Sequence, residues 1–140
     1  LRIGYGIACE EIIDLLVKAK MPWNVNCLAQ AAAVATLRDA EYSEKTRELI
    51  SREKTFLLDK LGKIRGFKVF PAHANFVFID VRKTGFTATQ LKEKMLRHGI
   101  LIRDCSSFRG LDEYYIRVSI RTRQDDEKLL AGLKKVIGGS

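Results

Sequence analysis

The chain has 140 residues, of which 46% are hydrophobic and 30% charged, with only two prolines, so its composition is that of a folded protein rather than a disordered one. Its net charge is +8, from 25 Lys and Arg against 17 Asp and Glu, and the basic residues are spread along the chain instead of forming a block. This charge favours small anionic partners over nucleic acid.

Three further compositional features exclude other classes. The longest mostly apolar run, at 28–37, is too short to cross a bilayer and contains polar residues, so we expect no membrane segment. The three cysteines are far apart and the two histidines stand alone, so we expect neither a disulfide framework nor a metal site. A reducing, cytoplasmic location fits this cysteine usage.

Hydrophobic periodicity and turn residues predict the elements in chain order. Alternating apolar residues predict a strand at 1–8, whose abrupt start suggests the cut edge of a larger sheet. Because Arg2 is followed by a glycine-spaced strand pattern and not by an apolar helix, we expect no signal peptide. Helices are predicted at 10–19, 27–40 and 43–61, the last one ending at Gly62. The later elements are strands at 67–70, 75–81, 100–103 and 115–121, and helices at 87–98 and 125–137. Thr87 and Gln90 predict a capping box at the first of these two helices.

The strand predicted at 115–121 carries the most informative pattern. Ile116 and Val118 alternate with Arg117, which therefore lies on the opposite face of the strand. An arginine held rigidly in mid-strand can present its planar guanidinium to a carboxylate or a phosphate. Arg103, at the end of the preceding strand, could converge on the same place. On spacing alone, the alternative that both arginines lie on the solvated face of an antiparallel sheet stays open.

Several short segments occur in an order that is familiar from one enzyme family. They are L-R-I-G-Y at 1–5, P-W-N-V-N at 22–26, A-Q-A-A at 29–32, A-N-F at 74–76, G-I-L-I-R-D at 99–104 and Y-I-R-V at 115–118. Together they resemble the aminotransferases of class I and II, in the branch of histidinol-phosphate aminotransferase and threonine-phosphate decarboxylase. The resemblance covers essentially all 140 residues.

The resemblance implies a fold class and a domain organisation. The chain would be the C-terminal part of an α/β enzyme of fold type I that depends on pyridoxal 5'-phosphate. Residues 1–40 would be the tail of the large cofactor-binding domain, and 41–63 a linking helix. Residues 64–140 would form a small α+β domain in the order β-β-α-β-β-α. Such enzymes are typically homodimers, so we expect a homodimer.

The resemblance also assigns roles to three arginines. Arg2 matches the arginine that pairs with the cofactor phosphate, and Arg117 matches the one that holds the substrate carboxylate. Arg103 matches an arginine that contacts the phosphate-bearing end of the substrate. For Asn75 we prefer a turn residue that opens a strand, and Trp23 could either line the site or pack.

The family's essential lysine is not among the matched segments. The lysine that forms a Schiff base with the cofactor, the aspartate beside the pyridine nitrogen and the stacking aromatic residue all lie upstream of the L-R segment in the family. Lys18 and Lys20 lie on or just after a predicted helix, in the wrong context to replace that lysine. We therefore expect no catalytic residue in this chain, and no activity from it alone.

Two activities within the branch compete, and both use a small phosphorylated amino substrate. The segment R-D-C-S-S-F-R-G-L at 103–111, followed by S-I-R-T at 119–122, looks closer to threonine-phosphate decarboxylase of cobalamin biosynthesis. In histidinol-phosphate aminotransferases of histidine biosynthesis, a glycine more often occupies the position of Arg121. The sequence therefore favours the decarboxylase modestly, with the aminotransferase as the alternative.

A function of another class is an RNA-binding sheet. Phe76 and Phe78 share one face of a predicted strand, as do the aromatic residues that stack on bases in such sheets. Val77 and Ile79 make the other face equally apolar, as in a strand that is covered on both sides, and no basic-aromatic signature surrounds the strand. A purely structural or dimer-forming role is a third possibility.

Overall fold

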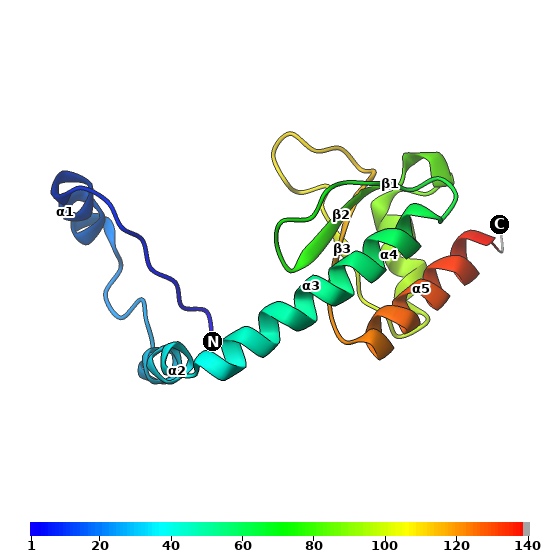
Figure 1. Ribbon diagram of the computed structural model, residues 1–140. Helices are drawn as coiled ribbons and strands as arrows, with labels where there is room; N and C mark the ends of the chain where they lie inside the picture. Colours follow the sequence, from blue (N-terminus) through cyan, green and yellow to red (C-terminus); the bar gives the residue numbers. More distant parts are fainter. Residues whose placement is uncertain (139–140) are drawn as a thin grey trace. The chain divides into compact units, whose positions relative to one another are not determined.

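The computed structural model describes residues 1–138 of the chain. Within that range it contains five α-helices, a short 3-10 helix and four strands (Figure 1). The chain divides into two compact units, a first unit at Leu1–Thr46 and a second unit at Arg47–Ser140. Helix α3 begins in the first unit and continues into the second.

The first unit contains helices α1 (Glu10–Ala19) and α2 (Cys27–Arg38), close to their predicted positions. Helix α2 begins where the side-chain oxygen of Asn26 accepts a hydrogen bond from the backbone N–H of Ala29, at 2.7 Å. The strand predicted at 1–8 is wrong, because residues 1–9 have no regular secondary structure. A strand needs a neighbour to satisfy its backbone groups, and the described first unit contains no other strand.

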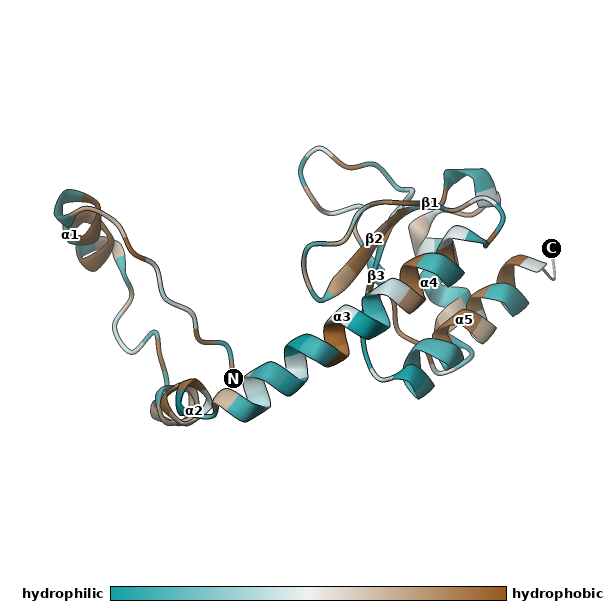
Figure 2. Ribbon diagram, in the orientation of Figure 1, coloured by the Kyte–Doolittle hydropathy of each residue, from teal (hydrophilic) through white to brown (hydrophobic). Residues whose placement is uncertain are grey.

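Most apolar side chains of the first unit are exposed. Ala29 is its single buried residue, whereas Trp23 is 97% exposed. The apolar residues Ile12, Leu15 and Leu16 of α1 are also exposed, and Figure 2 shows the hydrophobic colour on α1 and α2. An exposed apolar surface of this kind is typical of a segment that packs against another part of a protein.

Helix α3 (Ala40–Gly62) is longer than the sequence predicts. It begins three residues before its predicted start, because the carboxylate of Asp39 accepts a hydrogen bond from the backbone N–H of Tyr42 at 2.8 Å and caps the helix. Gly62 is the last residue of the helix. Gly66, four residues further on, has the left-handed backbone conformation, with a φ of 87°.

The second unit contains a four-stranded antiparallel sheet in the order β1-β2-β4-β3. Its strands are β1 (Lys68–Val69), β2 (Phe76–Asp80), β3 (Arg103–Asp104) and β4 (Tyr115–Ser119). The strand predicted at 100–103 is wrong over its first three residues. The backbone N–H of Ile100 donates to the carbonyl of Met95 in the preceding turn, at 3.1 Å, and pairing with β4 starts only at Arg103.

Helices α4 (Ala88–Leu96), α5 (Arg123–Gly138) and the end of α3 bury one face of this sheet. The 3-10 helix η1 (Arg82–Thr84) follows β2. The predicted order β-β-α-β-β-α is therefore confirmed, as is the capping box of Thr87 and Gln90. The core consists of apolar residues from these helices and from the inner face of the sheet, including Val77, Ile79, Ile116, Val118, Leu57, Leu61, Leu91, Met95 and Leu133.

The opposite face of the sheet is only half-buried at Phe76 and Phe78. The interpretation that this strand is covered on both sides is therefore not confirmed within the described residues. The open face carries a cluster of rings. Phe78 stacks on Tyr115 with ring centroids 5.2 Å apart, and Phe70 lies 5.4 Å from Phe78.

Candidate functional site

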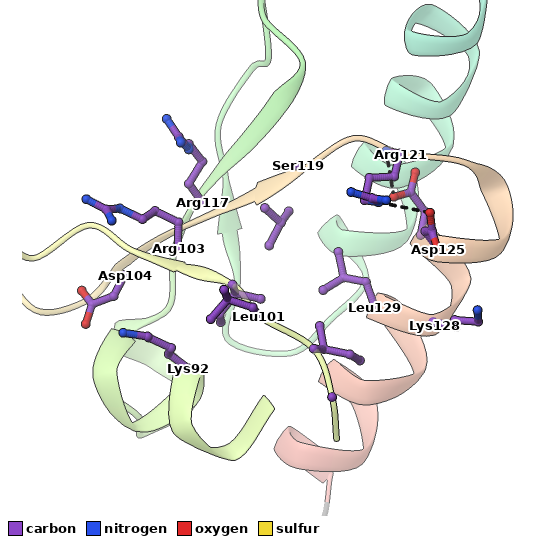
Figure 3. A pocket seen from close by; sticks show the side chains of 15 residues that line it. Lys92, Leu101, Arg103, Asp104, Arg117, Ser119, Arg121, Asp125, Lys128 and Leu129 are labelled. Atoms are coloured by element: carbon purple, nitrogen blue, oxygen red, sulfur yellow. Dashed lines mark hydrogen bonds and ion pairs between the residues drawn. The ribbon is translucent and has the colours of Figure 1, made fainter. Parts of the chain in front are cut away.

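Arg103 and Arg117 are direct neighbours across strands β3 and β4. Residues opposite each other in an antiparallel pair have Cβ atoms about 4.5–5.5 Å apart and project to the same face of the sheet. Figure 3 shows the two side chains leaving neighbouring positions on β3 and β4, with the guanidinium group of Arg117 pointing upward in the view and that of Arg103 to the left. The structure thus brings together the two arginines that the sequence singled out for substrate binding.

Neither of these two guanidinium groups has an acidic partner among residues 1–138. By contrast, Arg121 donates to Asp125 at 3.1 Å, and Arg123 donates to Glu53 at 2.7 Å. Like charges placed directly opposite each other on a sheet are destabilising. The pair therefore has its hydrogen-bond donors available for an anion that comes from outside the second unit.

Aromatic rings accompany both guanidinium groups. The Cζ atom of Arg117 lies 4.6 Å from the ring centroid of Phe76, and that of Arg103 lies 5.4 Å from the ring centroid of Phe108. Both distances are within the range of cation–π attraction. Sequence reasoning missed these contacts, because the spacing of residues along the chain does not reveal which strand lies beside which.

A pocket of about 690 Å³ extends from the two arginines along β4 to the start of α5 (Figure 3). Lys92 and Asp104 also line this part of the pocket, and the charge of Lys92 helps to lower the pKa of the Asp104 carboxyl. At the other end, Arg121 is neutralised by Asp125. Among the three arginines of the pocket, Arg103 and Arg117 are thus the two without an acidic partner among the described residues.

Cys105 lies two residues after Arg103 and is buried. Burial raises the pKa of its thiol, although the charges of Arg117 and Arg103 oppose that shift. A thiol with a raised pKa carries little thiolate at neutral pH and is a poor nucleophile. The arrangement therefore supports anion binding rather than thiol chemistry.

Arg2 belongs to the first unit, whereas Arg103 and Arg117 belong to the second. Its side chain is exposed, and its φ of 62° places it in the left-handed region, which is uncommon for a residue with a side chain. A largely apolar pocket of about 630 Å³ is lined by neighbouring residues of the extended segment and by α2, among them Ile3, Tyr5, Ala33 and Leu37.

Two acidic groups of the second unit were also missed by the sequence reasoning. Glu53 of α3 is buried and accepts hydrogen bonds from Arg123 and Arg52, which together lower the pKa of its carboxyl. Asp126 of α5 is buried as well, and burial raises the pKa of its carboxyl to about 6. No local sequence signal separates these two residues from solvated acids on helices.

Two negative findings concern only the described residues, 1–138. No group of three or more His, Cys, Asp or Glu side chains is placed to hold a metal ion. No helix is both long enough and apolar enough to cross a membrane.

Comparisons with known proteins agree on one family. A sequence model of the family described as aminotransferase class I and II matches residues 1–133. Histidinol-phosphate aminotransferase from Methanothermobacter thermautotrophicus is 42% identical over 137 residues, which make up 98% of this chain and 37% of that protein. The chain thus spans well under half of the length of the curated relatives that it matches.

Solved structures give the same result. Histidinol-phosphate aminotransferase from Clostridium acetobutylicum matches 94% of this chain with 39% of its own, at a TM-score of 0.81 and 32% identity. L-threonine-O-3-phosphate decarboxylase from Porphyromonas gingivalis matches 94% of this chain with 40% of its own, at a TM-score of 0.78 and 28% identity. The expected fold class, part of an α/β fold-type-I enzyme with a small α+β module, is confirmed. The chain belongs to the family of class I and II aminotransferases.

Proposed function

We propose that the complete protein is a pyridoxal-phosphate-dependent enzyme that acts on a small phosphorylated amino substrate. The observation that carries this proposal is the opposed pair of Arg103 and Arg117, which has no acidic partner among the described residues. Two adjacent guanidinium groups with free donors match the charge and the geometry of a phosphate. Relatives of this chain are named for histidinol phosphate and threonine phosphate, and both compounds carry a phosphate and an amino group.

The cofactor of this family is pyridoxal 5'-phosphate, and Arg2 fits one end of it. The Arg2 side chain is exposed, and no described residue pairs with it, so its donors are available for the cofactor phosphate. When bound, the cofactor supplies an electron sink for the negative charge that develops on the substrate carbon. The residues of this chain would bind and orient the anionic groups around that centre.

The substrate would be oriented by Arg117 and Arg103 together. Because the two residues are directly opposed, their guanidinium groups can share one phosphate. They can equally bind two anionic groups that are only a few bonds apart, as are the carboxylate and the phosphate of threonine phosphate. In either case, binding would neutralise two like charges at once, which favours a dianionic group over a single carboxylate.

Two reactions are candidates for the complete enzyme. Arg121, where a glycine is more frequent in histidinol-phosphate aminotransferases, favours threonine-phosphate decarboxylase. The 42% identity to the Methanothermobacter thermautotrophicus protein favours histidinol-phosphate aminotransferase. The anion-binding arginines serve both substrates, so the choice requires an assay.

The assay uses the complete enzyme with its cofactor. Carbon dioxide release from threonine phosphate would assign the decarboxylase, and transfer of the amino group of histidinol phosphate to a 2-oxo acid would assign the aminotransferase. Arg117→Gln should raise KM for the active compound strongly. Arg97→Gln, with the same change of charge on an exposed residue outside the pocket, should not. Turnover of neither compound would refute the proposal.

Three further proposals concern the activity of this chain alone, the oligomeric state of the complete enzyme and its location. This chain alone should be inactive, since Lys18 and Lys20 are exposed residues of α1 and its C-terminal end rather than members of the pocket. The exposed apolar surface of α1 supports packing against further protein, and we propose a homodimer for the complete enzyme. A cytoplasmic location stays a prediction.

A further inference from the structure

We propose that Phe76 and Phe108 are positioning residues, which hold the guanidinium groups of Arg117 and Arg103 in the orientation that binds the substrate anion. This inference rests on the proposed function, because it takes Arg103 and Arg117 as the groups that bind the substrate. Phe76 and Phe108 would touch these arginines and not the substrate. Its observations are the cation–π distances of 4.6 Å for Phe76 with Arg117 and 5.4 Å for Phe108 with Arg103.

The sheet register places Phe76 beside Arg117. Phe76 pairs with Ser119, and Phe78 pairs with Arg117, so Phe76 is the diagonal neighbour of the arginine on the same face. Long side chains reach such diagonal neighbours across an antiparallel pair. On one side, Arg117 faces Arg103, and the two positive charges repel each other. The guanidinium group of Arg117 also lies over the ring of Phe76.

A ring orients an arginine differently from an acidic side chain. A carboxylate would fix the guanidinium through its N–H groups, and the substrate would then compete for the same donors. An aromatic ring attracts the face of the guanidinium and leaves the N–H donors at its edge available. Arg82 is held in both ways, because it donates to Asp80 and Asp112 and also lies 5.2 Å from the ring centroid of Tyr114. Arg103 and Arg117 each have a ring but no acidic partner among the described residues.

The expected benefit is preorganisation. A free arginine side chain loses rotamer freedom when it binds a ligand, and this loss weakens binding. A ring that restricts the side chain before the ligand arrives reduces the loss. The gain appears as tighter binding of the anion in the ground state and the transition state alike, so KM should respond to removal of the ring while kcat changes little.

Phe78 provides a matched control. It lies on the same strand and the same face as Phe76 and is also half-buried. It stands directly opposite Arg117, yet its ring stacks on Tyr115 at 5.2 Å. Phe78→Leu therefore removes a ring from the same face of the sheet, but not one of the two rings over which the guanidinium groups of Arg117 and Arg103 lie.

The experiment compares Phe76→Leu, Phe108→Leu and Phe78→Leu in the complete enzyme with its cofactor. We expect the first two variants to raise KM for the phosphorylated amino substrate about two- to fivefold, with kcat within about twofold of the parent. The dissociation constant for inorganic phosphate, measured by calorimetry, should rise by the same factor. Phe76→Tyr keeps the ring and should restore both values. Phe78→Leu should leave both unchanged.

The proposal is overturned if Phe76→Leu and Phe78→Leu change the phosphate dissociation constant equally. It is also overturned if Phe76→Leu has no effect on that constant, or if the parent enzyme does not bind phosphate. The phosphate measurement also separates this proposal from the proposed function. Suppose that the enzyme turns over neither amino phosphate, but that Phe76→Leu weakens phosphate binding and Phe78→Leu does not. In that case the positioning role holds and the proposed reaction fails.

Discussion

Replacing Asp126 by Asn should stabilise the second unit at pH 8 and leave its stability nearly unchanged at pH 4. Asp126 lies in the first turn of α5 and is 1% exposed. One carboxylate oxygen accepts a hydrogen bond from the backbone N–H of Arg121 at 3.2 Å, and the other, Oδ2, is buried without a partner among the described residues. Burial raises the pKa of this carboxyl from 3.8 to about 6, with further raising by Glu53 and Asp125, against lowering by the Arg121 N–H and Arg123.

The direction of the pH effect follows from this shift. Because the pKa of Asp126 is higher in the folded state than in the unfolded chain, the folded state binds more protons between about pH 4 and pH 6. The free energy of unfolding therefore falls as the pH rises through this interval. The full loss is present above pH 6, where Asp126 is ionised in both states.

The magnitude has an upper limit of about 3 kcal/mol, which corresponds to a pKa change from 3.8 to about 6. Solvent near the end of α5 reduces this figure. The neutral amide also loses about 0.5 kcal/mol of attraction to the positive N-terminus of the helix. We therefore expect Asp126→Asn to gain about 1–2 kcal/mol at pH 8.

Urea unfolding followed by far-UV circular dichroism tests this prediction. Fluorescence is less suitable, because the single tryptophan, Trp23, is exposed in the first unit. Asp125→Asn is the control. Hydrogen bonds from Arg121 and Thr122 lower the pKa of Asp125, so this change should reduce stability at pH 8. Equal stability of Asp126→Asn and the parent at both pH values would refute the inference of a buried, unpaired charge.

Five further predictions concern stability, phosphate binding and self-association. Gly66→Ala should cost about 2–4 kcal/mol by urea unfolding, since φ is +87° and a new Cβ would lie 2.7 Å from the carbonyl oxygen of Lys83. Gly85→Ala, with φ +82° and open space around it, should cost about 1–2 kcal/mol. Thr87→Ala removes the capping box and should cost about 1 kcal/mol in the same assay. Inorganic phosphate at ten times its dissociation constant should stabilise the chain by about 1.4 kcal/mol over chloride of equal ionic strength in thermal unfolding, and Arg117→Gln should abolish this gain. The isolated chain should self-associate through its exposed apolar residues, and a monomer at all concentrations in sedimentation would contradict this.

Local signals predicted most helices and the order of elements in the second unit. The capping box of Thr87 and Gln90 was recognisable because both of its hydrogen bonds join residues three apart in sequence. The alternation around Arg117 predicted its face correctly, because side chains alternate along any strand. The strand predicted at 1–8 failed for the opposite reason. Alternation supplies a pattern, but a strand also requires a partner.

The environment of the site depended on information that no local pattern holds. That Arg103 stands opposite Arg117 follows from the register of β3 and β4, and the ring beneath Arg117 comes from a strand about 40 residues away in sequence. The burial of Glu53 likewise depends on Arg123, 70 residues further along the chain. The resemblance to a known family identified Arg103 and Arg117 as binding residues. The contacts that orient their side chains are visible only in the folded chain.

The placement of charges, rather than their number, separates the functional arginines from the structural ones. Arg123 and Arg52 share the buried carboxylate of Glu53, and the Arg123–Glu53 ion pair links the start of α5 to α3. Arg103 and Arg117 oppose each other without an acid, so as charges they oppose folding instead of supporting it. A ligand that neutralises both is the simplest reason for such an arrangement, because stability is often lost at sites that serve function.

The contacts of the aromatic rings weigh against RNA binding on the open face of the sheet. Its rings are already engaged by one another and by guanidinium groups, whereas base recognition requires rings that are free to stack.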